Sequence, residues 1–112
     1  MIKVTCWIRP HRLEPVKAAI AALNVNGMSV SDVRGCGVAP ETTSFFGGEE
    51  HVIALPLRAK IEVVAPDSLK DAIIEAVLKH ARTGEPGDGK IIVERVQDAI
   101  RIRTSERGEA AI

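Results

Sequence analysis

Residues 57–80 read LRAKIEVVAPDSLKDAIIEAVLKH, a strand pattern followed directly by a helix pattern. From Leu57 to Val64, apolar and mostly charged residues alternate, which predicts a half-buried β-strand. From Leu69 to His80 the apolar residues recur with the three- and four-residue spacing of an amphipathic helix. The turn between them contains Pro66-Asp67-Ser68, and Asp67 or Ser68 is the predicted N-cap of the helix.

The same strand-then-helix order occurs at the start of the chain. Residues 2–9 alternate, and residues 13–23 carry a second amphipathic stripe with Pro15 in the first turn, where proline is tolerated. Further strands are predicted at residues 28–35 and 90–96, with a short last strand at 100–103. The order β-α-β-β-α-β plus a short β predicts an α+β fold of the ferredoxin-like split βαβ type, in which an antiparallel sheet carries two helices on one face.

Length and composition favour a single small domain, residues 1–112, with a mass of 12.0 kDa. Fifteen basic and fifteen acidic residues give no net charge, which argues against a nucleic-acid surface. No apolar run reaches the ~18 residues of a membrane span, so we expect no membrane insertion. The cysteines, Cys6 and Cys36, lack the spacing of a disulfide framework, which favours a cytoplasmic location.

The alternation also assigns a second, mixed face to the predicted sheet. The Ile, Val and Leu positions face the helices, while the opposite face carries Trp7, Arg9, Arg58, Lys60, Glu62, Arg101 and Arg103 together with Val64 and Ile92 or Val96. An antiparallel sheet can leave one face in water, but apolar and charged residues mixed in so small a domain suggest an oligomer formed around it.

Residues 36–56 lack periodicity apart from the apolar run 52–55, and this predicts a long functional loop. The loop contains Phe45, Phe46, Gly47, Gly48, Glu49, Glu50 and His51. The two phenylalanines either dock on a partner or pack back onto the domain. Cys36, Glu49, Glu50 and His51 offer potential metal ligands, so a trimeric metal-binding or metal-tolerance-linked protein of the same architecture is the alternative function.

Residues 84–90, GEPGDGK, have the G-x-x-x-x-G-K spacing of a phosphate-binding P-loop. Ile91 replaces the Ser or Thr that would hold magnesium, and the predicted order of helix, loop and strand is the reverse of the P-loop order. We therefore reject a Walker A motif. Three glycines still allow backbone amides to approach an anion, and Lys90 adds positive charge. The alternative is a glycine-rich connection with a solvated lysine.

Arg101 and Arg103 are two residues apart on the predicted last strand, so their side chains would project from one face about 6–7 Å apart. This spacing suits neighbouring phosphates, although an exposed basic strand face is the alternative. No Ser-His-Asp or Cys-His constellation is evident, and no carboxylate pair is placed for acid–base chemistry. An enzyme is therefore not expected, and a weak ATPase ranks third among the functions.

Together these stretches resemble the PII signal-transduction (nitrogen-regulatory) family over nearly the whole chain. The matching stretches are 9–10, 13–16, 27–30, 33–37, 60–64, 83–91, 100–104 and 110–112, of which 83–91 and 100–104 are the most specific. The resemblance implies a cylindrical homotrimer with nucleotide sites in the clefts between subunits. It also implies that the loop, called the T-loop in this family, docks on a partner such as a membrane transporter or a metabolic enzyme.

The resemblance also implies roles for individual residues. The residues implied at the phosphates of ATP or ADP lie in 87–90 and near the C-terminus: Gly87, Asp88, Gly89, Lys90, Arg101 and Arg103, with the backbone of Gly37. The residues implied around the base and ribose are Trp7, Gly35, Glu62 and Val64, and Ser29 stands where the family has a threonine near the adenine.

The departures from the family pattern lie in and beside the loop. Val38-Ala39-Pro40 stands where the family generally has Arg-Gln-Lys, whose glutamine helps to ligate magnesium beside ATP and 2-oxoglutarate. Arg58 replaces a lysine that contacts 2-oxoglutarate, and so it is a possible co-ligand residue. Phe46 and His51 occupy the two loop tyrosine positions. We therefore expect a divergent sensor of adenine nucleotides, with lost or altered 2-oxoglutarate sensing and no uridylylation. Magnesium bound together with the nucleotide is possible but not required. Bicarbonate is an alternative co-ligand to 2-oxoglutarate.

Overall fold

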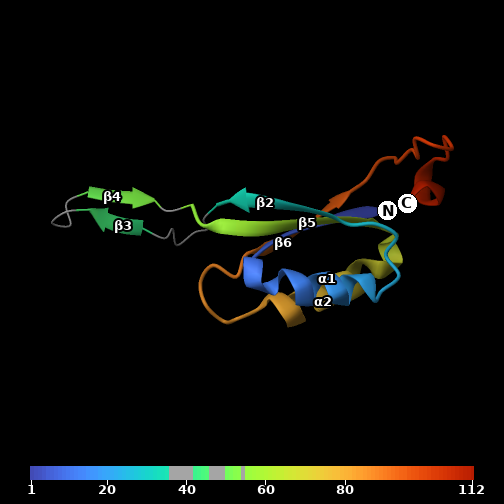
Figure 1. Ribbon diagram of the computed structural model, residues 1–112. Coiled ribbons are helices and arrows are strands. Elements are labelled where there is room, and N and C mark those ends of the chain that lie inside the picture. Colours follow the sequence, from blue (N-terminus) through green and yellow to red (C-terminus); the bar gives the residue numbers. More distant parts are fainter. Residues whose placement is uncertain (36–41, 46–49, 54) are drawn as a thin grey trace.

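The computed structural model describes residues 1–35, 42–45, 50–53 and 55–112 of the protein (Figure 1). Its main sheet has four antiparallel strands, in the order β2-β5-β1-β6. The strands are β1 (Ile2–Ile8), β2 (Ser29–Arg34), β5 (Leu57–Ala65) and β6 (Lys90–Arg95). Two helices, α1 (Leu13–Ala21) and α2 (Lys70–Ala81), lie together on one face of this sheet. The order and the one-sided helices confirm the predicted split βαβ fold.

The core lies between the sheet and the helices, where the alternation predicted it. Every second residue of β1 from Ile2 and of β5 from Ala59 is buried, because successive side chains of a strand point to opposite faces. Leu57, at the start of β5, is exposed. From the helices, Val16, Ile20, Ile73 and Val77 complete the buried layer, each with 2 % or less of its surface exposed. The amphipathic stripes therefore face the sheet, as the sequence predicted.

The opposite face of the sheet is open and mixed in character. The strand register places Trp7 between Lys60 and Lys90, and Thr5 between Glu62 and Ile92. Val64 lies beside Lys3 on the same face. The predicted combination of apolar and charged side chains on the face away from the helices is thus confirmed for these residues.

The connection from β2 to β5 contains a second, two-stranded sheet. Strand β3 (Thr42–Phe45) pairs antiparallel with β4 (Glu50–Ile53), and the hairpin lies beyond the end of the main sheet in Figure 1. At the base of the connection, the backbone N–H of Gly35 donates to the carbonyl oxygen of Pro56 at 3.2 Å. The apolar run 52–55 therefore contributes its first two residues to a strand.

The predicted short last strand at 100–103 is wrong. Ile100 forms only an isolated bridge with Arg107, and residues 102–104 form a turn. The turn is stabilised by hydrogen bonds from the N–H of Arg101 to the carbonyl of Glu106 and from the N–H of Ser105 to the carbonyl of Arg101, at 2.9 and 2.8 Å. These local bonds use the backbone groups that a sheet neighbour would need. A short 3₁₀ helix, η3 (Gly108–Ala111), follows.

The predicted N-cap of α2 is also wrong. A 3₁₀ turn, η2 (Asp67–Leu69), precedes the helix and starts after Pro66, without a side-chain cap. The carboxylate of Asp67 instead forms ion pairs with the amino group of Met1 at 2.9 Å and with Arg95 at 2.6 Å. The charged partners at the ends of β1 and β6 therefore take the oxygen atoms that a helix cap would have used. At the start of α1, η1 (Pro10–Arg12) makes a similar 3₁₀ entry.

Candidate functional site

The loop between α2 and β6 contains the glycine-rich motif, and Asp88 organises it. The carboxylate of Asp88 accepts hydrogen bonds from the N–H of Thr83 at 2.8 Å, the N–H of Gly84 at 2.9 Å, the Thr83 hydroxyl, and Nε of Arg9 at 3.2 Å. These contacts, the Thr83 hydroxyl first among them, hold the pKa of Asp88 well below its usual range. Asp88 therefore stays ionised, and its carboxylate holds the loop together by accepting these hydrogen bonds.

The backbone of this loop depends on glycine. Gly84, Gly87 and Gly89 have φ angles of +90°, +100° and +96°, which side-chain-bearing residues rarely adopt. Gly89 also packs against the backbone carbonyl of Trp7, where β6 begins to pair with β1. The sequence predicted that the glycines let backbone amides approach an anion. In the structure, Gly89 also lets the start of β6 approach the backbone of β1.

Two guanidinium groups converge on Gly87. A β-carbon built on Gly87 would lie 3.0 Å from Nη2 of Arg9 and 3.2 Å from Nη2 of Arg58. Arg9 is held there because its Nη2 also donates to the carbonyl of Pro86 at 2.5 Å. Lys90 adds an exposed charge at the start of β6. Cations and backbone amides at one turn are the groups that bind a multiply charged anion.

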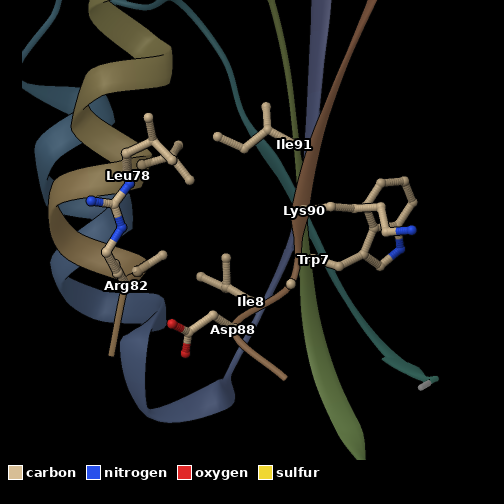
Figure 2. Close-up of a pocket in the computed structure, with 10 residues that line it drawn as sticks. Trp7, Ile8, Leu78, Arg82, Asp88, Lys90 and Ile91 are labelled. Atoms are coloured by element: carbon tan, nitrogen blue, oxygen red, sulfur yellow. The ribbon is translucent and has the colours of Figure 1, made fainter. Parts of the chain in front are cut away.

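The open face of the sheet begins beside this loop. Figure 2 shows Trp7 and Lys90 on the same side of the strands, opposite to Ile8 and Ile91. Nζ of Lys60 lies 5.9 Å from the centroid of the Trp7 ring, within the range of a cation–π contact. The predicted pocket residues Trp7, Glu62 and Val64 therefore share one face with Lys90.

Glu62 is the acidic group of this face. Its carboxylate pairs with Lys60 at 3.2 Å and Lys3 at 3.3 Å, and these hydrogen bonds, that of Lys60 first, lower its pKa. Ser29 pairs with Glu62 across β2 and β5, which places it at the same level of the sheet. Gly35 lies just after β2, at the base of the connection to β5.

The sequence did not predict the cavity on the helix side of the same strands. It has a volume of about 280 Å³ and lies between the end of α2 and the start of β6 (Figure 2). Most of its wall is apolar, and the lining residues are Trp7, Ile8, Val77, Leu78, Ala81, Arg82, Asp88, Gly89, Lys90 and Ile91. The side chains of Trp7 and Lys90 point to the other face of the sheet (Figure 2). No sequence pattern indicated it, because its shape depends on how far the last turn of α2 stands from β6.

Within one chain, Arg101 and Arg103 do not join the glycine-rich loop. Lys90 pairs with Trp7 and Arg95 pairs with Ile2, so β6 runs about 17 Å from one end of the sheet to the other. The C-terminal segment follows at the far end, near the N-terminus, in Figure 1. The expectation that a strand would present the two arginines on one face is wrong, because they lie at a turn. Within the chain, the two predicted phosphate-binding groups therefore lie at opposite ends of the sheet.

Part of the predicted site lies outside the residues that the structure describes. This applies to Cys36, Gly37 and the loop residues Phe46, Gly47, Gly48 and Glu49, and for Phe45, Glu50 and His51 only the backbone is described. Among the described residues, no group of three or more His, Cys, Asp or Glu side chains could hold a metal ion. The metal-binding alternative rests on Cys36 and His51 and stays a prediction. No helix in the described ranges is long and apolar enough to cross a bilayer.

The sheet, its one-sided helices and the cations beside the glycine-rich turn define a ferredoxin-like α+β protein. A family model described as "Nitrogen regulatory protein P-II" matches residues 1–106. The chain is 41% identical to the nitrogen regulatory protein P-II of Haemophilus influenzae and 43% identical to that of Rhodobacter capsulatus, in each case over 100% of both chains. A solved structure of Bacillus subtilis GlnK superimposes with a TM-score of 0.81 at 33% identity, covering 99% of this chain and 97% of the other.

The chain therefore belongs to the P-II family of nitrogen-regulatory, signal-transduction proteins. The resemblance noted in the sequence is thus confirmed. Members of this family are signalling regulators and not enzymes, so the protein is not assigned a catalytic function.

Proposed function

We propose that the protein binds ATP or ADP in clefts between the subunits of a homotrimer and regulates a partner protein through residues 36–56. The observation that carries this proposal is the convergence of Arg9 and Arg58 on Gly87, in a turn bordered by Lys90. A nucleotide polyphosphate carries several negative charges, and its desolvation is offset only by several cations and amides together. The turn at Gly87 brings backbone amides together with cations from β5 and from the end of β1.

The open face beside the loop suits the rest of a nucleotide. The ring of Trp7 and the side chain of Val64 offer apolar surface to a base, and the register places Ile92 on the same face. The carboxylate of Glu62, whose pKa is lowered, is an acceptor for ribose hydroxyls. A nucleotide laid along this face would have its phosphates at the glycine-rich loop.

The placement of Arg101 and Arg103 supports an assembly. Both project from the end of the sheet away from the loop, so they contribute to the site of a neighbouring copy if copies are arranged head to tail around an axis. The exposed apolar residues of this region favour burial between copies, since Ile100 is 55% and Ile102 is 99% exposed in one chain. A homotrimer satisfies both observations.

The loop residues that differ from the family pattern support a change in which ligands and modifications the protein responds to. The chain contains no tyrosine, which removes the group that uridylylation needs. Val38-Ala39-Pro40 lacks the side-chain oxygen and the charges implied for magnesium and 2-oxoglutarate. The protein would then report adenine nucleotide levels to a cytoplasmic partner, a transporter or a metabolic enzyme, with a changed or absent second ligand.

Two measurements on the purified protein test the proposal. Calorimetric titration with ATP, ADP and AMP should give saturable binding of ATP or ADP, and light scattering at micromolar concentration should give a mass near three times the 12.0 kDa of the chain. A monomer would contradict the assembly. A trimer that binds none of the three nucleotides would contradict the site.

A further inference from the structure

Arg101 and Arg103 differ in their surroundings, although both are expected at the nucleotide phosphates. Nη1 of Arg101 lies 3.1 Å from Oε1 of Glu106, in an ion pair that bridges the C-terminal turn. Arg103 makes no hydrogen bond or ion pair with any residue that the structure describes. One arginine is therefore free to receive a phosphate, while the other already holds a carboxylate.

The ion pair is built into the turn. The backbone N–H of Arg101 donates to the carbonyl of Glu106 at 2.9 Å, and Ser105, which precedes Glu106, has a φ of +62°. The N–H of Glu106 donates to the hydroxyl of Thr104 at 3.3 Å. The backbone thus holds the two residues together, and the side-chain pair forms within this frame.

We propose that Glu106 competes with the nucleotide phosphate for Arg101 and thereby lowers the affinity of the site. This inference rests on the proposed function, because it assigns a role to a residue beside the proposed nucleotide site. A carboxylate and a phosphate are both anions, and both use the same N–H donors of a guanidinium. If the two were bound to Arg101 at the same time, they would repel each other unless further cations lay between them. Nucleotide binding then exchanges one partner of Arg101 for the other.

Exposure makes this exchange feasible. The side chains of Arg101 and Glu106 are 40% and 43% exposed, so Glu106 can turn into water without being buried as an unpaired charge. The nearby pair of Arg107 and Asp98 is held by two donors, Nε and Nη2, on one carboxylate oxygen. The Arg101–Glu106 pair, with one contact, is the weaker of the two and the one beside the proposed ligand.

The test measures ATP affinity in a Glu106→Gln variant by calorimetry. The substitution removes the charge and leaves the backbone bonds of the turn in place. Because an exposed ion pair is worth little, we expect ATP to bind about twofold to fivefold more tightly. Glu109→Gln is the control, because it removes the same charge three residues further along, where no ion pair forms with the described residues. It should change the affinity by less.

A double-mutant cycle shows whether the effect passes through Arg101. In an Arg101→Ala background, Glu106→Gln should leave the ATP affinity unchanged, since the contested group is gone. If Glu106→Gln alone binds ATP as the wild type does, or more weakly, the inference is overturned. Weaker binding would mean that Glu106 positions Arg101 for the phosphate. An equal gain in the Arg101→Ala background, or in Glu109→Gln, would also overturn it. Only a wild-type protein that binds neither ATP nor ADP would overturn the proposed function as well.

Discussion

A β-carbon placed on Gly89 would lie 1.6 Å from the backbone carbonyl oxygen of Trp7. This distance is far inside any van der Waals contact. The carbonyl belongs to β1 at the point where β6 begins to pair with it, so it cannot move without disturbing the sheet. Gly89 is therefore a requirement of the fold as well as of the candidate site.

The first prediction concerns this contact. Gly89→Ala should reduce the free energy of unfolding by about 3–5 kcal/mol, because it adds a backbone clash to an unfavourable φ. Gly84→Ala is the matched control, since Gly84 has a φ of +90° but open space around it. It should lose only about 1–2 kcal/mol. Urea unfolding of both variants measures the difference, and equal losses would show that the clash relaxes without cost.

The second prediction concerns the cations of the proposed nucleotide site. Lys90→Ala, Arg101→Ala and Arg103→Ala should each weaken ATP or ADP binding, by roughly 1.5–3 kcal/mol or about tenfold to a hundredfold, as one charge-assisted contact is lost. Arg101→Ala should cost less than Arg103→Ala, because Arg101 must first release Glu106.

Lys70→Ala is the control for these three variants. Lys70 is an exposed lysine at the start of α2, so its substitution removes a charge without touching the glycine-rich loop or the C-terminal turn. Calorimetric titration of all four variants with ATP measures the affinities, and Lys70→Ala should bind as the wild type does. Normal ATP affinity in the three site variants would mean that the phosphates bind elsewhere.

The third prediction concerns acid stability. The hydrogen bonds of Arg95, and then of the Met1 amine, lower the pKa of Asp67 from 3.8 to about 2. A carboxyl group whose pKa is depressed in the folded state stabilises the protein above its ordinary pKa, and this contribution is lost as the pH falls toward the folded value. The wild type should therefore lose stability between about pH 4 and pH 2.

Asp67→Asn should lose less stability over that range than the wild type. Urea midpoints at pH 5, 3 and 2 measure the effect, with Asp71→Asn as the control, because Asp71 makes no ion pair with the described residues. Some acid sensitivity should remain in Asp67→Asn, since the pKa values of Asp88 and Asp98 are lowered too. Parallel pH profiles of wild type and Asp67→Asn would contradict the assignment.

The fourth prediction concerns 2-oxoglutarate, which should enhance ATP binding little or not at all. Its two carboxylates and keto oxygen need magnesium and cationic partners when desolvated, but Ala39 has no side-chain oxygen for the metal. Arg58 is already drawn toward the backbone, since its Nη1 donates to the carbonyl of Leu57 at 3.0 Å. An arginine fork also does not replace the point charge of a lysine.

Titration of 2-oxoglutarate into the ATP–magnesium complex checks this prediction. Arg58→Lys restores the implied lysine but not the metal ligand, so it should not restore the response. Saturable micromolar binding by the wild type would mean that another loop residue, such as Glu41 or Glu50, ligates the metal. The same titration with bicarbonate tests the alternative co-ligand.

The fold could be predicted from the sequence because its signals are local. The alternation in β5 and the stripe in α2 identify their elements and their buried faces without reference to the rest of the chain. The segment 100–103 also alternates, yet it leads into a turn, because the backbone of Arg101 bonds to residues 105 and 106 and not to a neighbouring strand. Alternation over four residues is too short to distinguish a strand from a turn.

The residue types around the glycine-rich loop could be read from the sequence, but their arrangement in space could not. The glycines and Lys90 were identified from their spacing, whereas the convergence of Arg9 on the loop depends on contacts 77 and 79 residues apart in sequence. The structural role of Asp88 was missed for a similar reason, although Thr83, five residues earlier, was a potential signal. Residues that act through long-range packing leave no pattern in the neighbouring sequence.

The hydrogen bond between Gly35 and Pro56 has an evolutionary consequence. Because β2 and β5 are neighbours that pair from Arg34 and Leu57 onward, the chain leaves the sheet and returns to it at adjacent points. Doubling the length of such an excursion adds only about 0.6 kcal/mol of closure entropy. The sequence between β2 and β5 can therefore change in length and composition during evolution without disturbing the sheet. A related protein could in this way acquire a new binding partner on the same fold.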